Sequence, residues 1–137
     1  MRQPAVEGVI LAAQKVHFDY ERKSHSIDNV LNSLEVDVLP SIALVDVWGK
    51  LLFSGVSEIG IWITVMNPED EVMLITEKSL MSNIRDSLMT PGIDFSMSIR
   101  FLANMEGNYK IQLCSENKEI FIYPLYISCQ KQFGANF

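Results

Sequence analysis

The sequence feature that most constrains the fold is a strict alternation of apolar and polar side chains over residues 94–103. Successive side chains of an extended strand point to opposite faces of its sheet. A period of two over ten residues therefore predicts a half-buried β-strand. Its buried face would consist of Phe95, Met97, Ile99, Phe101 and Ala103.

The alternation continues toward the C-terminus. Tyr109, Ile111 and Leu113 fall on one face of a second run, after a turn in which Gly107 can adopt a positive φ. A further turn over residues 115–118 leads to the apolar run 120–127. The C-terminal third therefore predicts three consecutive antiparallel strands, a meander.

Strand patterns also cover the rest of the chain. Residues 59–65 and 72–76 flank a Pro-containing turn at 67–70, which predicts a hairpin. We expect further strands over 9–18, 27–38 and 42–53, and the last would break or bulge at Gly49 and Lys50. The spacing of Leu80, Ile84 and Leu88, before Pro91 and Gly92, predicts a short helix or turn near residues 79–89.

These elements predict a single all-β domain over residues 1–137, with no alternation of strands and helices. The expected fold is an antiparallel immunoglobulin-like β-sandwich of about seven or eight strands. Tyr109, directly after a Gly-containing turn, is typical of the tyrosine corner of such sandwiches.

The order of five segments resembles a group of small bacterial β-sandwich proteins of unknown function. The segments are Val-Ile-Leu-Ala-Ala at 9–13, Ser-His-Ser-Ile at 24–27, Val-Leu-Pro at 38–40, the turn at 67–72 and Gly-Asn-Tyr-Lys-Ile at 107–111. The resemblance spans most of the chain and implies the sandwich fold. It transfers no catalytic residue.

Charge and composition exclude several classes of partner. The net charge is −6, and the eleven Lys and Arg residues are scattered, so we expect no nucleic-acid partner and no anionic membrane partner. No run approaches the roughly twenty apolar residues of a membrane span. We expect a cytoplasmic protein of a bacterium or phage, in which Cys114 and Cys129 remain thiols.

No motif for chemistry stands out, and we expect neither a metal nor a cofactor. His17 and His25 flank one turn and could form at most a weak pair, and no zinc or nucleophile motif is present. The carboxylates Glu35 and Asp37, and those at 69–71, fit solvated strand and turn positions. An enzyme with an acidic site is the weakest alternative.

Apolar side chains on faces that should be wet are more informative. They indicate a cover, either within the monomer or from another subunit. The interface candidates are Trp62, Met66, Met73, Ile75, Phe121, Tyr123 and Leu125.

The leading hypothesis is a non-enzymatic interaction or structural domain that self-associates or binds another protein. The alternative is a small-molecule or carbohydrate-binding sandwich that uses Trp48, Trp62 or Tyr20 as a stacking platform.

Overall fold

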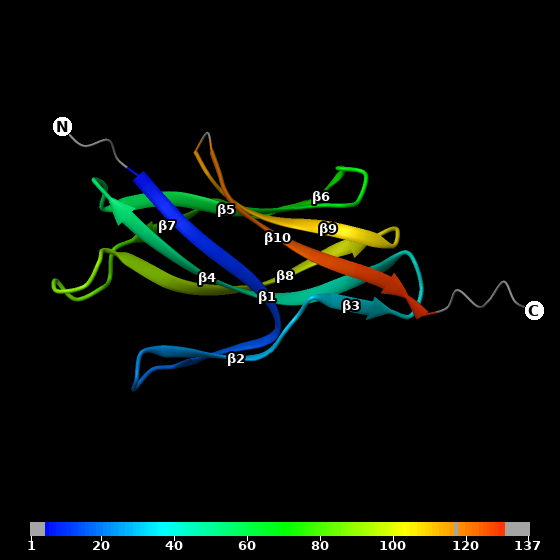
Figure 1. The fold of residues 1–137 in the computed structure, drawn as a ribbon, viewed down its shortest axis with the longest axis horizontal. Coiled ribbons are helices and arrows are strands. Elements are labelled where there is room, and N and C mark those ends of the chain that lie inside the picture. Colours follow the sequence, from blue (N-terminus) through cyan, green and yellow to red (C-terminus); the bar gives the residue numbers. More distant parts are fainter. Residues whose placement is uncertain (1–4, 117, 131–137) are drawn as a thin grey trace, which may run out of the picture.

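Two β-sheets face each other across an apolar core in the computed structural model of this protein (Figure 1). The structure describes residues 5–116 and 118–130, and this part holds ten strands and no α-helix. The strands are β1 (Ala5–Asp19), β2 (Ser24–Val30), β3 (Ser33–Val36), β4 (Ser41–Ser54), β5 (Glu58–Met66), β6 (Val72–Ile75), β7 (Ser79–Ser82), β8 (Gly92–Ala103), β9 (Gly107–Ser115) and β10 (Lys118–Cys129). The predicted all-β sandwich is confirmed.

The strand order places long strands at the centre of each sheet. The four-stranded sheet has the order β2-β1-β4-β8, and the six-stranded sheet has the order β3-β10-β9-β5-β6, with β7 also paired to β5. All pairings are antiparallel except that of β3 with β10, which is parallel. The second sheet is therefore mixed, whereas a wholly antiparallel sandwich of seven or eight strands was predicted.

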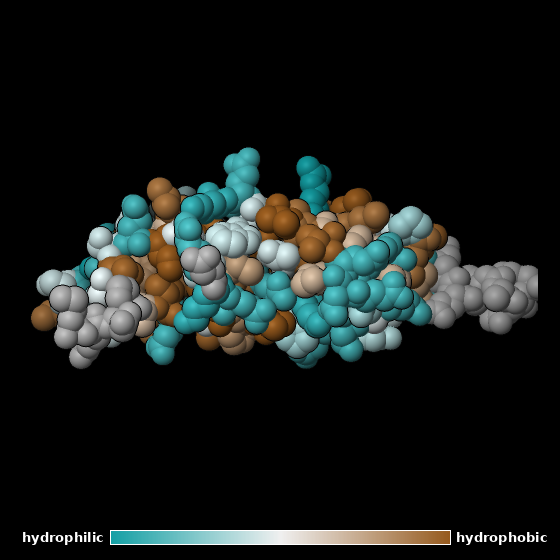
Figure 2. Space-filling model, turned by 90° about the horizontal axis from the view of Figure 1, so that it is seen from above, coloured by the Kyte–Doolittle hydropathy of each residue, from teal (hydrophilic) through white to brown (hydrophobic). Residues whose placement is uncertain are grey.

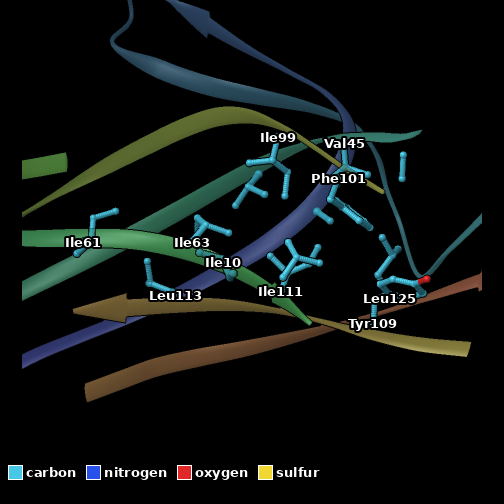
Figure 3. Close-up of a cluster of buried hydrophobic side chains, with 14 of the residues drawn as sticks. Ile10, Val45, Ile61, Ile63, Ile99, Phe101, Tyr109, Ile111, Leu113 and Leu125 are labelled. Carbon is cyan, nitrogen blue, oxygen red and sulfur yellow. The ribbon is translucent and has the colours of Figure 1, made fainter. Parts of the chain in front are cut away.

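The core lies between the sheets and is built by the alternating apolar positions of both. Figure 3 shows side chains from β1, β4, β5, β8, β9 and β10 pointing into this space. Phe95, Ile99 and Phe101 of β8 are buried, as the alternation predicts, and so are Tyr109 and Ile111 of β9. The fully buried side chains with the largest volumes are Tyr109, Leu51, Ile61, Ile63, Ile111, Leu113, Leu125 and Ile127.

The predicted C-terminal meander is only half correct. β9 and β10 pair with each other, but β8 pairs with β4, so the chain crosses to the other sheet between β8 and β9. Alternation shows that a strand is half-buried but does not identify its neighbour. The turn containing Gly107, which has φ of +136°, is thus a corner between the sheets.

The predicted helix near 79–89 is replaced by a strand and a turn. β7 pairs with β5 over Ser79–Ser82, and residues 83–91 form an irregular connection to β8. Leu80, Ile84 and Leu88 are 66%, 72% and 95% exposed, so their helical spacing builds no buried face. An amphipathic helix needs tertiary packing for its stability, and these side chains have none.

Two details of the N-terminal half also differ from expectation. The predicted strand over 27–38 divides into β2 and β3, which lie in different sheets, and Asn29 near the division has a positive φ. β4 neither breaks nor bulges at Gly49, because its register with β1 and β8 continues there. A Cβ at Gly49 would overlap the Phe95 ring, so this glycine leaves room for a core aromatic.

Candidate interaction surfaces

The predicted interface residues divide between the two faces of the six-stranded sheet. Leu125 is fully buried, and Phe121, Tyr123 and Met73 pack against the same core. Leu125 is therefore a core residue, which corrects its assignment to an interface. The Tyr123 hydroxyl also donates to the Leu31 carbonyl oxygen at 2.6 Å, so this side chain is held within the monomer.

The remaining candidates lie on the outer face of the six-stranded sheet. Ile75 pairs with Thr64, whose neighbours along β5 on the same face are Trp62 and Met66. Ile75 is 62% exposed, whereas Trp62 and Met66 are half-buried. We call Trp62, Met66, Val72 and Ile75 the hairpin patch.

The hairpin patch continues toward β10 on the same outer face. Thr64 pairs with Gln112 of β9, and Gln112 pairs with the exposed Ile122 of β10. Along β10, side chains at every second position share a face, so Ile122, Pro124 and the exposed Tyr126 lie on the same outer face. In Figure 2, hydrophobic surface interrupts the hydrophilic surface where β6 lies.

The outer face of the four-stranded sheet carries a second apolar group. Ile42 pairs with Leu102, and both are exposed, as is Leu44 beside them. Further along the same face, Asp46 accepts hydrogen bonds from the Ser98 hydroxyl at 2.7 Å and from the Val16 amide at 2.9 Å. Burial raises the pKa of Asp46, but these two bonds, with Lys15 and His17 nearby, outweigh burial and lower its pKa.

A groove of about 400 Å³ lies beside β3 and the start of β4. Its apolar lining includes Ile42 and Leu44, and its polar lining includes Glu35, Asp37 and Ser41. The Ser41 Oγ atom is buried, and no described residue hydrogen-bonds to it. The Leu39–Pro40 peptide bond beside the groove is cis. Sequence reasoning missed this groove although its lining residues are nearly contiguous, at 34–38 and 41–44, because no local pattern shows that β3 and β4 lie in different sheets.

The aromatic residues predicted as a stacking platform do not come together. Trp48 lies on β4 in the four-stranded sheet, and Trp62 lies on β5 in the six-stranded sheet. Tyr20 lies at the turn between β1 and β2, where its ring meets Phe18 edge-on at 4.9 Å. Each of the three residues would therefore have to serve as a platform separately, and this alternative stays a prediction.

His17 and His25 do not form a pair. His17 pairs with Ser26, and His25 pairs with Phe18, so the two imidazoles occupy opposite faces of the hairpin. His17 Nε2 lies 3.0 Å from an Asp28 carboxylate oxygen, and His25 packs against the Phe18 ring. Over residues 5–116 and 118–130, no group of three or more His, Cys, Asp or Glu residues could hold a metal ion.

The remaining features are the two cysteine thiols and the length of any helices. Cys114 and Cys129 are not bonded to each other, and burial raises the pKa of the Cys114 thiol. Over residues 5–116 and 118–130, the structure contains no helix with the length and apolar character of a membrane span.

Asn67 is the buried polar residue that sequence reasoning did not single out. Its side chain is fully buried, and its Oδ1 accepts hydrogen bonds from the amides of Glu69 and Glu71, both at 2.9 Å. Its Nδ2 donates to Glu71 Oε1 at 2.7 Å and to Asn104 Oδ1 at 3.2 Å. The Asn-Pro pair at the start of the turn was an available signal, since Asn side chains often hydrogen-bond to the backbone two residues on.

Comparison with known proteins gives one structural likeness to report. No protein-family model matches the chain, and no curated protein matches it. Among solved structures, the chain is similar to the CARDB domain of the PF1109 protein from Pyrococcus furiosus, determined in complex with di-metal ions. The two chains are 14% identical with a TM-score of 0.47, and the match covers 93% of this chain and 96% of that one.

Proposed function

We propose that this chain is a non-enzymatic β-sandwich domain that associates with a second copy of itself. The observation that carries the proposal is the hairpin patch, where Ile75 and Val72 are 62% and 52% exposed beside the half-buried Trp62 and Met66. Aromatic and Met side chains are enriched in interfaces because they desolvate a large area. Burial of one such side chain stabilises a contact by about 1.5–3 kcal/mol.

Charge and location are consistent with a protein partner. The net charge of −6 and the scattered basic residues favour association with protein over nucleic acid or an anionic membrane. We further propose a cytoplasmic location in a bacterium or phage, where Cys114 and Cys129 would remain thiols.

The test is a charge placed in the hairpin patch. Ile75→Glu should lower the average mass measured by light scattering below that of wild type at the same concentration while the β-sheet spectrum is retained. The matched control is Leu88→Glu, because Leu88 is 95% exposed in the connection between β7 and β8. If Ile75→Glu and wild type have the same mass at every concentration, the hairpin patch is not the interface.

A second candidate function is small-molecule binding in the groove beside β3. The buried Ser41 hydroxyl and the Glu35 and Asp37 carboxylates would supply polar contacts, and Ile42 and Leu44 would supply apolar contacts. Screening of amines and sugars by thermal shift would test it. A ligand whose stabilisation disappears in Ser41→Ala would support binding there, and no shift with any compound would count against it.

A further inference from the structure

β8 is the longest strand at an edge of either sheet. It runs from Gly92 to Ala103 and pairs with β4 on one side only, since it ends the order of the four-stranded sheet. The other outer strands are β2 with seven residues and β3, β6 and β7 with four residues each. A long exposed edge presents a row of backbone donors and acceptors to which another strand can pair.

The ladder with β4 shows which backbone groups of β8 remain available. The Phe53 amide bonds to the Pro91 carbonyl, and the register continues without a shift, so the odd-numbered residues of β8 bond to β4. The even-numbered residues must then direct their amides and carbonyls to the open edge. Gly92 confirms this, because its amide bonds to Asn83 Oδ1 and its carbonyl accepts the Ile84 amide, outside the ladder.

Beyond Gly92, the even-numbered residues Asp94, Ser96, Ser98 and Arg100 have open backbone groups. Within the described residues, β8 pairs with no strand but β4, and no backbone hydrogen bond outside the strand ladders reaches these four residues. These four alternate residues supply enough unpaired amides and carbonyls for a short antiparallel ladder. Such a ladder would end at Gly92, where Asn83 and Ile84 already occupy the edge.

The side chains along this edge carry opposite charges at its two ends. Asp94 Oδ1 accepts from Lys50 at 2.8 Å and from Arg85 at 3.4 Å, whereas Oδ2 accepts no hydrogen bond from a described residue. The exposed Arg100 guanidinium has no hydrogen bond or ion pair in the described part of the chain. Both side chains point to the outer face, because both positions are even.

We propose that a second copy of this chain adds to the open edge of β8 in antiparallel orientation, with Met97 opposite Met97 of the other copy. In this register, Asp94 lies opposite Arg100 of the other copy, and Ser96 lies opposite Ser98. The two-fold axis repeats each contact, as an isologous dimer requires. The open amides and carbonyls then bond in pairs, and each Arg100 reaches the Oδ2 of the opposing Asp94.

The opposite face of β8 also suits this pairing. Met97 is half-buried at the centre of the strand, between the buried Phe95 and Ile99. With Met97 on the axis, Phe95 of one copy lies opposite Ile99 of the other, so apolar side chains meet apolar side chains. Other registers of this edge, such as Ser98 opposite Ser98, leave Asp94 opposite Leu102 and lose the charge match.

Amide hydrogen exchange of the full chain, followed by NMR or mass spectrometry at low and high concentration, tests the proposal. The amides of Ser96, Ser98 and Arg100 should be slowed at least tenfold at high concentration. Those of Phe95, Met97 and Ile99 are an internal control, since β4 protects them at every concentration. Even-numbered amides that exchange rapidly while the mass rises would overturn the edge pairing.

Variants at two positions distinguish the contribution of the backbone hydrogen bonds to association from that of the side-chain charges. Ser96→Pro removes an open-edge amide and should weaken association about tenfold or more, because two hydrogen bonds are lost per dimer, whereas Ser96→Ala should not. Arg100→Glu places like charges opposite each other and should weaken association, whereas Arg100→Lys should largely retain it. Equal dimerisation by Ser96→Pro and Ser96→Ala would contradict the model of a shared ladder.

The inference rests on the proposed self-association, but it concerns a different surface. If Ile75→Glu leaves the concentration-dependent protection of β8 intact, the hairpin patch fails and the edge pairing stands. If Ile75→Glu gives a monomer and Ser96→Pro changes nothing, the edge pairing fails and the hairpin patch stands. A wild-type chain that is monomeric at all concentrations rejects both.

Discussion

The Tyr109 hydroxyl donates a hydrogen bond to the Met105 carbonyl oxygen at 2.8 Å, across the corner at which the chain leaves one sheet for the other. The same hydroxyl oxygen accepts from the amides of Asn104 and Met105 at 3.1 and 3.2 Å. The Tyr109 ring is fully buried and packs against Phe101 at 5.7 Å between ring centroids. One side chain thus fills the core and satisfies the backbone of the connection between β8 and β9.

We expect Tyr109→Phe to destabilise the fold by about 1–3 kcal/mol, because it leaves part-buried backbone groups at the corner without their partner. Urea unfolding followed by tryptophan fluorescence would measure the change. The control is Tyr126→Phe, since Tyr126 is 43% exposed on the same sheet. Equal stability of Tyr109→Phe and wild type would show that the corner hydrogen bonds contribute nothing.

The hydrogen bonds of the Asn67 side chain should contribute as much to the stability of the fold as those of the Tyr109 hydroxyl. Asn67→Ala removes the acceptor of the Glu69 and Glu71 amides and the donor to Asn104, so it should destabilise by about 1–3 kcal/mol. Asn108→Ala, at an exposed position, should change stability by less than about 0.5 kcal/mol. The same denaturation measurement decides between the two, and a similar small effect of both changes would refute the role of the Asn67 network.

Asp46 makes stability depend on acid pH. Its pKa is lowered in the folded state, so its contribution is fully present above the unfolded pKa and is lost as the pH falls through the folded pKa. Asp46→Asn should therefore be less stable than wild type at neutral pH, and the difference should shrink below about pH 4. A difference in unfolding free energy that stays constant from pH 7 to pH 2 would contradict this assignment.

Truncation of two side chains on β10 should destabilise the fold to different extents, since Leu125 faces the core and Ile122 faces outward. Leu125→Ala should cost about 2–5 kcal/mol through lost burial and a cavity. Ile122 is 40% exposed, so Ile122→Ala should cost well under half as much. Thermal unfolding of the two variants in parallel checks the orientation of the strand, and a larger loss in Ile122→Ala would reverse it.

The sequence patterns predicted those features of the fold that depend on local periodicity. The buried face of β8, the hairpin between β5 and β6 and the turn before Tyr109 follow from alternation and from glycine and proline positions. The pairing of β8 with β4, and the parallel pairing of β3 with β10, depend on contacts between distant residues, which no local pattern records.

The candidate surfaces were predictable to a smaller extent. Two apolar faces on the last strand predicted cover on both sides, but Ile122 and Tyr126 on the outer face are 40% and 43% exposed. Because both sets alternate with period two, the sequence could not show that Leu125 faces the core and Ile122 faces outward. The open edge of β8 was beyond prediction, because an edge is defined by the absence of a neighbour. Asp94 and Arg100 acquire meaning only once that edge is known.

The central claim of this account is that the folded chain associates with itself, and sedimentation velocity of the wild-type protein tests it most directly. At low micromolar concentration we expect the 15.5 kDa monomer, and at hundreds of micromolar we expect a weight-average mass of at least twice that value. A single 15.5 kDa species over the whole range would contradict the account.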